Sequence, residues 1–442
     1  MSAGPDFDRD NNGNDNGNGN GNPIFGSANL DIVDPDSYLA GFPHATFKRL
    51  RDEQPLSWWP EHDGGKGFWA VTRYEDLLFV SQHVELFSSA QGITLEEIEG
   101  DDFDLRRNML EYDPPEHTRY RRLVSKPFSR REVYSYEDGI RGLARDVVLE
   151  AAGTELFDYT ELIAKQLPMR MLGRMLGVPD SDGDWLVKQG DALLGNLDPE
   201  MTDYPVGFTD TDQFKHIPFR SPAALELYTY AEKQAELRHE CPGKDLISAL
   251  LAPTIDGECL TDLQFKNLFV LMISAGNDTT RYTMAGGLKA LAEHPEQLQE
   301  LRQACIDGDG VMVDRAVEEV LRWTSVTMHF RRTATQDVEM HGQTIRKGDK
   351  VLEWFSSANF DDRQFADPFR FDIHRWPNDH VAFNLRSPHL CLGAQLARME
   401  LKLLFQELLP RITAVEVVGP IERLRSNFIC GMKRLPVKVT WA

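Results

Sequence analysis

Residues 383–393 read FNLRSPHLCLG, and they lead into the stretch AQLARMELKLLFQELL at 394–409. Apolar residues recur at helical spacing in the second stretch, so Cys391 lies where a loop enters a helix. The free backbone N–H groups at a helix start favour a thiolate over a thiol and can hydrogen-bond its sulfur. A lone buried cysteine is usually only a small hydrophobic residue. The loop position and the neighbouring Pro388, His389 and Gly393 favour a ligand instead.

The longest predicted helix lies upstream of that loop and runs from Thr261 to His294. Thr261 and Gln264 form a capping box, and Pro295 ends the helix. Some 30 residues at ~1.5 Å each give roughly 45–50 Å, enough to cross a whole domain. The middle of this helix must therefore be buried.

That middle reads LMISAGNDTT at 271–280, where apolar turns run into Gly276, Asp278 and Thr279. Gly276 weakens a helix, and a Thr hydroxyl competes for the backbone carbonyl one turn earlier, so we expect a local opening. An acid and an alcohol beside a groove suit proton delivery to a small bound ligand, which makes Asp278 and Thr279 candidate catalytic residues. A helix kink whose polar groups satisfy one another is the alternative.

The rest of the chain reads mostly as helix, with β-rich runs at 68–72, 351–354 and 435–440. We therefore predict a mainly α fold with minor β. Residues 1–26 are rich in Asn, Gly and Asp and lack the apolar side chains that would offset the cost of ordering, so we expect disorder there. Residues 27–442 contain no linker or repeat, which predicts one domain.

Composition excludes several classes of protein. The formal net charge of -22 argues against nucleic-acid binding, which needs a surplus of Lys and Arg. The five cysteines are odd in number and include no CxxC pair, which excludes a disulfide framework or a zinc ribbon. No apolar run is long enough to span a bilayer and the start lacks a signal peptide, so we expect a cytoplasmic protein without a membrane anchor.

Four sequence strings occur in a fixed order along the chain, namely AGNDTT at 275–280, EVLR at 319–322, FRRTATQD at 330–337 and PHLCLGAQLAR at 388–398. In this order and spacing they resemble the bacterial cytochrome P450 family, and the resemblance covers nearly everything after the tail. One string alone is weak, since Glu-x-x-Arg is a common surface pair on helices. Four in register are strong, and they imply that family's fold, with the long central helix over a buried haem.

The resemblance implies haem b (iron protoporphyrin IX) as the cofactor. Cys391 then becomes the axial thiolate and metal ligand, which favours O–O cleavage. Asp278 and Thr279 match the acid and alcohol pair of the family.

Four cations match residues that bind the haem propionates in the family. His117 and Arg121 lie four residues apart on a predicted helix that starts at Asp113 in the sequence DPPE. Arg332 and His389 complete the set. Ordinary solvated charge is the alternative for these side chains.

The resemblance also implies a buried ion pair between Glu319 and Arg322. Its spacing from Cys391 places a third member at Arg375, with Arg370 as the rival. Because a buried ionic triad is costly unless it is completely hydrogen-bonded, we expect it to hold the approach of the cysteine loop rather than to add net stability.

The loop before Cys391 departs from the family pattern. Family glycines supply positive φ and a close approach to the haem, whereas this chain has Asn384 and Ser387 and one residue more than the commonest form. Asn384 can adopt positive φ, and Ser387 does so less readily. Together with FWAVTRYEDL at 68–77 and SSANFD at 356–361, the longer loop resembles the bacterial group that hydroxylates sterol side chains, branched lipids and terpenoids.

The resemblance therefore implies a monooxygenase that takes two electrons from NAD(P)H through ferredoxin reductase and a ferredoxin, activates O2 and hydroxylates a small apolar substrate. Candidate substrate-facing residues, for which plain core is an equal alternative, are Phe269, Met272, Ser274, Val326, Thr327, Met328 and Phe330. Basic residues that could gather into a patch and steer an acidic ferredoxin are Arg121, Arg122, Lys126, Arg386, Arg398 and Lys402. A haem-thiolate peroxygenase or isomerase and a non-catalytic haem sensor are the alternatives.

Overall fold

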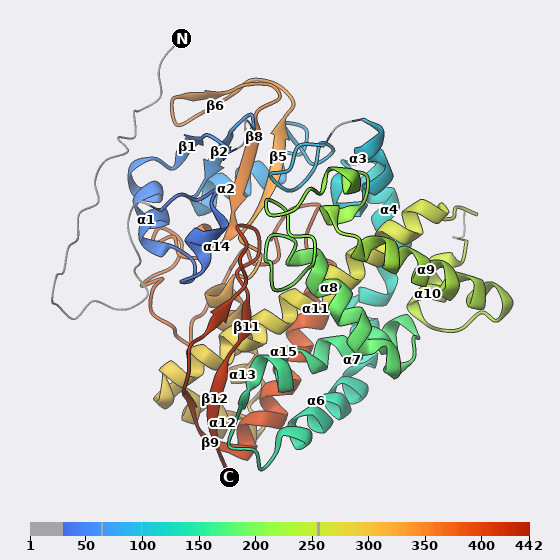
Figure 1. Ribbon diagram of the computed structural model, residues 1–442. Helices are drawn as coiled ribbons and strands as arrows, with labels where there is room; N and C mark the ends of the chain where they lie inside the picture. Colours follow the sequence, from blue (N-terminus) through green and yellow to red (C-terminus); the bar gives the residue numbers. More distant parts are fainter. Residues whose placement is uncertain (1–29, 63–64, 99, 254–256) are drawn as a thin grey trace.

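The computed structural model describes residues 30–62, 65–98, 100–253 and 257–442 (Figure 1). The tail at 1–26, predicted to be disordered, lies outside the described residues. The α-helices are α1 (His44–Glu53), α2 (Tyr74–Gln82), α3 (Asp101–Arg106), α4 (Glu116–Val124), α5 (Arg130–Ser135), α6 (Glu137–Ala151), α7 (Gln166–Leu176), α8 (Gly183–Leu194), α9 (Ala223–Glu240), α10 (Leu246–Leu251), α11 (Asp262–Glu293), α12 (Pro295–Asp307), α13 (Gly310–Thr324), α14 (Phe355–Ala358) and α15 (Ala394–Leu408). The strands are β1 (Leu56–Trp59), β2 (Phe68–Val71), β3 (Phe87–Ser88), β4 (Leu156–Asp158), β5 (His329–Ala334), β6 (Val338–Met340), β7 (Gln343–Ile345), β8 (Lys350–Trp354), β9 (Ile412–Val417), β10 (Glu422–Arg423), β11 (Met432–Arg434) and β12 (Pro436–Trp441). The predicted fold, mainly α with minor β, is confirmed.

The main sheet has five strands in the order β1-β2-β8-β5-β3. Two of the predicted strands, β2 and β8, run parallel at its centre, with Phe68 opposite Lys350. β8 is buried along its whole length, as expected for an inner strand. The third predicted strand, β12, pairs with β4 and β9 in a separate sheet. β5 lies beside β8 and brings Arg332 into the interior.

α11 crosses the middle of the molecule as one long helix (Figure 1). The predicted capping box is present, because Gln264 N donates to Thr261 Oγ1 at 3.2 Å and Thr261 N donates to Gln264 Oε1 at 3.0 Å. The helix ends at Glu293, within a residue of the predicted end. At about 1.5 Å per residue, its 32 residues span roughly 48 Å.

The predicted opening of α11 near Gly276 is wrong, since the helix is continuous there. Thr279 Oγ1 donates to Ala275 O at 2.7 Å, and Thr283 Oγ1 repeats the contact to Thr279 O at 2.8 Å. A carbonyl oxygen has two lone pairs, so it can accept a hydroxyl without giving up its place in the helix. The polar side chains are therefore accommodated without a break.

Two glycines let α11 approach α13 closely. A Cβ on Gly286 would lie 2.5 Å from Thr324 Cγ2, and a Cβ on Gly287 would lie 2.7 Å from Val320 Cγ1. Neither distance is sterically allowed, so this packing requires glycine at both positions. The contact fixes α13, and with it Glu319 and Arg322, against the central helix.

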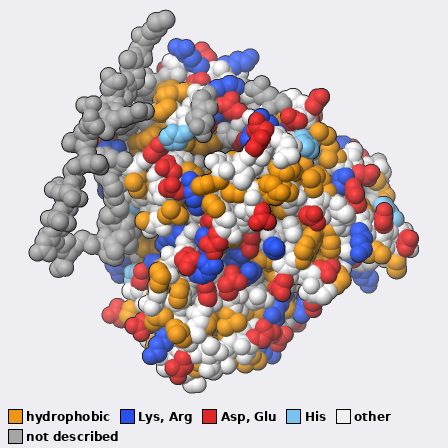
Figure 2. All heavy atoms as spheres, in the orientation of Figure 1, with side chains coloured by type: hydrophobic (Ala, Val, Ile, Leu, Met, Phe, Trp, Pro, Cys, Tyr) orange, Lys and Arg blue, Asp and Glu red, His pale blue; other side chains and the backbone are white. Residues whose placement is uncertain are grey.

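The surface facing the viewer in Figure 2 mixes acidic, basic and hydrophobic side chains. This face therefore offers no extended area of one charge. Within the described ranges, no helix is both long and apolar enough to cross a membrane.

Candidate functional site

Cys391 lies at the end of the loop that enters α15. Its backbone N–H donates to Phe383 O at 2.9 Å, and the helix begins three residues later at Ala394. Although Cys391 keeps exposed surface, protein surrounds it closely, and this desolvation raises the pKa of its thiol. The backbone N–H groups of Gly393 and Ala394 lower that pKa, as predicted, and so does Arg121. Desolvation outweighs these contributions.

The loop before Cys391 turns at two residues with left-handed backbone, Asn384 at φ 57° and Arg386 at φ 65°. Asn384 was expected to take this conformation, whereas Arg386 was not singled out. Ser387 is not among the left-handed residues, and its Oγ accepts from His389 N at 3.1 Å. Asn384 is further fixed because its Oδ1 accepts from Ser81 Oγ at 2.9 Å.

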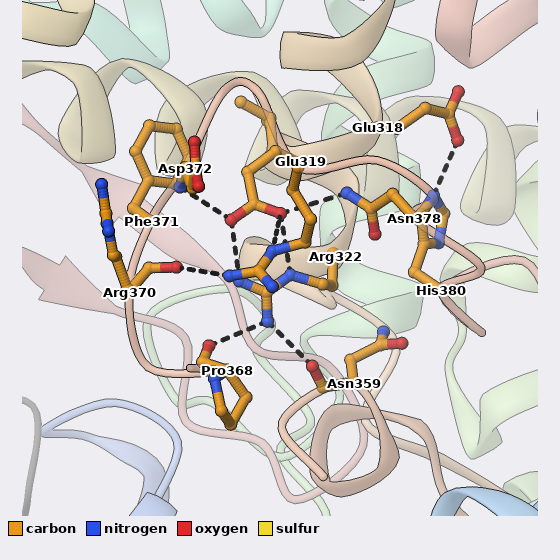
Figure 3. Close-up of polar contacts among 12 residues, drawn as sticks. Glu318, Glu319, Arg322, Asn359, Pro368, Arg370, Phe371, Asp372, Asn378 and His380 are labelled. Atoms are coloured by element: carbon orange, nitrogen blue, oxygen red, sulfur yellow. Dashed lines mark hydrogen bonds and ion pairs between the residues drawn. The ribbon is translucent and has the colours of Figure 1, made fainter. Parts of the chain in front are cut away.

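A buried ion cluster joins α13 to the segment before the cysteine loop (Figure 3). Arg322 Nε and Nη2 donate to the two carboxylate oxygens of Glu319, both at 2.8 Å. Arg375 Nε donates to Glu319 Oε2 at 3.1 Å. Arg375 is therefore the third member, as predicted. The rival Arg370 contributes only its backbone carbonyl, and its side chain points away from Glu319 (Figure 3).

The remaining donors of this cluster bind backbone oxygens. Arg322 Nη1 donates to Asn359 O and Pro368 O, each at 2.9 Å. Arg375 donates to three carbonyls of residues 366–370. Within the described residues, no buried side-chain nitrogen or oxygen of Glu319, Arg322 or Arg375 lacks a partner. The chain thus satisfies this cluster by itself.

The four predicted propionate-binding residues come together beside Cys391. α4 begins at Glu116, three residues after the predicted start at Asp113, and His117 N donates to Asp113 O at 2.9 Å. The rings of His117 and His389 lie 4.1 Å apart between centroids. Arg121 Nη2 donates to Leu390 O at 2.6 Å, and Arg332 reaches the same neighbourhood from β5.

Three of these side chains have buried nitrogen atoms without a hydrogen-bond partner within the described chain. Among the described residues, no partner exists for either ring nitrogen of His117, for Nδ1 of His389 or for Nε of Arg332. Burial lowers the pKa of His117 to about 4, and burial with the nearby Arg332 lowers that of His389 to about 2. Buried donors of this kind are costly unless an acceptor is supplied. The arrangement therefore suits an anionic ligand.

A cavity of about 1030 Å³ lies over the central part of α11. Leu271, Ala275 and Thr279, one turn apart along the helix, form part of its lining. Phe330 and Phe428 add aromatic surface. The predicted alcohol therefore faces a space that can hold a sizeable apolar molecule.

Asp278 does not line this cavity, and it is buried on another side of α11. Its Oδ1 lies 3.1 Å from Arg281 Nη2 and accepts from Asn277 Nδ2 at 2.9 Å. The same Arg281 nitrogen donates to Asp191 Oδ1 of α8 at 2.6 Å. Burial raises the pKa of Asp278, and Arg281 opposes this. The acid and the alcohol are neighbours in sequence that face different surroundings.

Comparison with known proteins identifies the family. A family model described as Cytochrome P450 matches residues 223–417. A steroid C26-monooxygenase of Mycobacterium tuberculosis is 35% identical over 422 residues, covering 93% of this chain and 92% of the relative. The chain belongs to the cytochrome P450 family. A methyl-branched lipid omega-hydroxylase of the same organism is 35% identical, covering 90% of each chain. The structure of a Mycobacterium marinum cytochrome P450 in complex with pseudoionone has a TM-score of 0.79 and 37% identity, covering 89% of this chain and 94% of that one.

The cytochrome P450 family implies a haem, and the residues beside Cys391 fit one. The two propionates of haem are carboxylates, which would supply acceptors for the orphaned nitrogens of His117, His389 and Arg332. A nearby carboxylate would also raise the pKa values of both histidines. Cys391 has exposed surface from which it could reach an iron atom.

The substrate-facing candidates of this cytochrome P450 divide into two groups. Ser274, Thr327 and Phe330 line the cavity. The other four, Phe269, Met272, Val326 and Met328, are buried in apolar clusters and do not line it. The face of α11 that carries Leu271 and Ala275 turns to the cavity, whereas Phe269 and Met272 point into the core. Helical periodicity could have indicated Leu271 and Ala275, since they precede Thr279 by two turns and one turn.

The predicted basic patch of this cytochrome P450 is smaller than expected. Arg398 Nε lies 2.6 Å from Glu318, and Lys402 Nζ lies 2.7 Å from Asp314, so both charges are neutralised locally. Arg122, Lys126 and Arg386 are exposed and have no acidic partner among the described residues. These three are the unneutralised residues of the predicted patch, and we call them the reduced proximal patch.

Proposed function

We propose that this cytochrome P450 hydroxylates an apolar substrate of terpenoid, sterol or fatty-acid-like type, using O2 and two electrons that a ferredoxin and its reductase deliver from NAD(P)H. The observation that carries the proposal is the cavity over α11, where Leu271 and Ala275 offer apolar surface next to Thr279. The sterol and lipid hydroxylases among the relatives support the substrate type. We propose that the catalytic domain spans residues 27–442.

In this proposal, one group of site residues binds the cofactor and another transfers protons. Bound haem b supplies dioxygen activation, which a thiolate ligand promotes. Cys391 would ligate the iron, while the cations that bind the propionates would be His117, Arg121, Arg332 and His389. The Thr279 hydroxyl would present a proton to the cavity. Asp278 would exchange protons from behind the helix, where Arg281 and Asp191 hold it in position.

The test is turnover of the haem-loaded enzyme with NADPH, a ferredoxin and its reductase, with products identified by mass spectrometry across terpenoids, sterols and fatty acids. We expect product only when the electron carriers are present. Product formed equally well from hydrogen peroxide alone would indicate a peroxygenase. Ligand binding without any product would indicate a sensor.

The ligand assignment has a separate spectroscopic test. In Cys391→Ala we expect the reduced, carbon-monoxide-bound protein to lose the absorption typical of thiolate ligation. Cys430→Ala, which alters another partly buried cysteine, should retain it. A thiolate-type spectrum in Cys391→Ala contradicts the assignment.

A further inference from the structure

One end of the cavity is polar, and the proposed chemistry does not use it. Arg106, the last residue of α3, lies with Nη2 2.9 Å from Glu96 Oε2, and Arg220 pairs with the other oxygen of the same carboxylate. Glu111 lines the cavity too, and its carboxylate binds Asn108, two residues after Arg106. Arg106 and Glu111 are buried. We call Glu96, Arg106, Glu111 and Arg220 the polar end.

The backbone of Arg106, which belongs to the polar end, lies far from Thr279 along α11. Asn267 Nδ2 of α11 donates to Leu105 O at 3.0 Å and to Arg107 O at 3.1 Å, so the backbone of Arg106 is held beside Asn267. Asn267 precedes Thr279 by twelve residues, which is roughly 18 Å along a helix axis. A molecule that touches both regions must therefore be elongated.

One carboxylate oxygen of Glu111 is free to make a further hydrogen bond. Its Oε2 accepts from Asn108 N at 3.0 Å and from Asn108 Nδ2 at 2.8 Å. No described residue donates to its Oε1. Burial raises the pKa of Glu111 although Arg106 opposes the shift. A carboxyl group that is easily protonated can either donate or accept a hydrogen bond.

Charge at the cavity disfavours an anionic ligand. The residues that line it include six carboxylates against three guanidinium groups. At the polar end Glu96 and Asp212 together balance Arg106 and Arg220, and further along Lys350 pairs with both Glu61 and Glu97. Arg425 pairs with Asp36, so among the described lining residues no guanidinium group is left for a carboxylate, whose burial without a partner is costly.

We propose that the polar end binds the hydroxyl or ketone group of an elongated, uncharged substrate through Glu111 and Arg106, and that it selects against carboxylates. The inference rests on the proposed function and narrows its substrate class to neutral sterol-like or long-chain alcohols and ketones. Because the backbone of Arg106 lies beside Asn267, roughly 18 Å along α11 from Thr279, we expect oxidation at a part of the molecule remote from its polar group.

Two matched ligand series test this proposal on the haem-loaded enzyme. The first is hexadecane, hexadecan-1-ol and hexadecanoate, and the second is cholestane, cholestanol and cholestanol sulfate. Affinity is measured from the high-spin shift of the haem spectrum. We expect the alcohol to bind roughly two- to tenfold more tightly than the hydrocarbon, which is the worth of one hydrogen bond, and the anion to bind more weakly than the alcohol.

Variants of Glu111 link that preference to the polar end. Glu111→Leu should abolish the advantage of the alcohol over the hydrocarbon, while Glu111→Gln, which keeps a donor and an acceptor, should preserve it. Asn108→Ala weakens the local cap without removing Glu111 Oε1, so it should also preserve the ratio. The hydroxylated product should carry its new oxygen far from the original polar group.

Three results would overturn the proposal, namely tighter binding of the anion, an unchanged alcohol preference in Glu111→Leu, or oxidation next to the polar group. In each case turnover continues, so the proposed monooxygenase function stands. Absence of both spectral shift and product with all six ligands contradicts the proposed function and the polar end together.

Discussion

Two groups of buried charged or ionisable side chains lie near the cysteine loop, and they differ in whether the chain itself supplies all their hydrogen-bond partners. In the Glu319 cluster every buried side-chain donor and acceptor of the triad is paired within the described chain. In the set proposed to bind the propionates, nitrogens of His117, His389 and Arg332 have no partner within the described chain. A cluster whose hydrogen bonds are all made within the chain serves to hold the fold together. A cluster with unpaired buried nitrogens is instead suited to bind a ligand that supplies the missing partners.

Asp278 shows that position in the sequence does not decide whether a buried polar side chain is paired within the protein or faces a ligand site. It is paired with Arg281 and so resembles the complete cluster, although it stands next to Thr279, which faces the cavity. Stability should therefore depend on Glu319, cofactor affinity on His117, and catalytic coupling on Thr279. The following experiments test that division.

The largest expected effect is on stability, from Glu319→Gln. Neutralising this carboxylate leaves Arg322 and Arg375 buried without their counter-charge, so we expect a loss of about 3–5 kcal/mol in the free energy of unfolding. Urea unfolding of the haem-free protein measures it. Glu318→Gln, one residue away and partly exposed, is the control and should cost less. Equal losses in the two variants would contradict the special role of the triad.

His117→Leu should separate stability from cofactor affinity. It removes two unsatisfied ring nitrogens, so the haem-free protein should be as stable as the wild type or more so. Haem affinity should fall by about 1.5–3 kcal/mol, the worth of a hydrogen bond to a charged group. Haem titration and thermal melting provide the two measurements. His44→Phe, which changes a half-buried histidine outside this set, should leave haem affinity unchanged.

The lowered pKa values of His117 and His389 also predict that the stability of the haem-free protein depends on pH. The folded-state pKa values of His117 (about 4) and His389 (about 2) lie below the ordinary value, so the unfolded chain binds more protons as pH falls below about 6.5. Stability should then fall with falling pH from about 6.5 toward 4, by at most ~1.4 kcal/mol per pH unit for each histidine. Melting between pH 7 and 5 tests this. The haem-loaded protein should show a shallower slope, and equal slopes would contradict propionate contact with these rings.

Thr279→Ala should change coupling more than stability. The lost hydrogen bond to Ala275 O is offset in part by the higher helix propensity of Ala, so we expect less than about 1 kcal/mol of destabilisation. Product formed per NADPH consumed should fall, with peroxide or water rising. Thr283→Ala removes the same kind of bond one turn later, away from the cavity, and should leave coupling intact. Unchanged coupling with a lowered melting temperature would make Thr279 a structural residue.

The smallest expected effect concerns the reduced proximal patch. Arg122→Met should slow reduction by an acidic ferredoxin severalfold at low salt, and the difference should shrink as ions screen the charge over about 8–10 Å. Lys402→Met is the matched control, because Asp314 already neutralises Lys402. Stopped-flow reduction at several ionic strengths measures both. Equal effects of the two variants would exclude docking at Arg122.

Much of the framework was readable from short-range patterns. The capping box at Thr261 and Gln264 and the break at Pro295 set the ends of α11. The loop-to-helix junction placed Cys391, and spacing selected Arg375 over Arg370 for the ion cluster. These features depend on hydrogen bonds and steric rules within a few residues, or on a resemblance with fixed spacing, so the sequence alone was sufficient for them.

Only the tertiary structure decided whether each side chain is packed in the core, lines the cavity or forms an ion pair. Periodicity defines the faces of α11, yet the neighbours of those faces put Phe269 and Met272 in the core and Leu271 at the cavity. Glu318 neutralises Arg398 across 80 positions of sequence, which no local pattern shows. The polar end likewise joins Glu96, Arg106 and Arg220 from three separate segments. Burial and ion pairing are set by elements distant in sequence, because desolvation and Coulomb forces act through space.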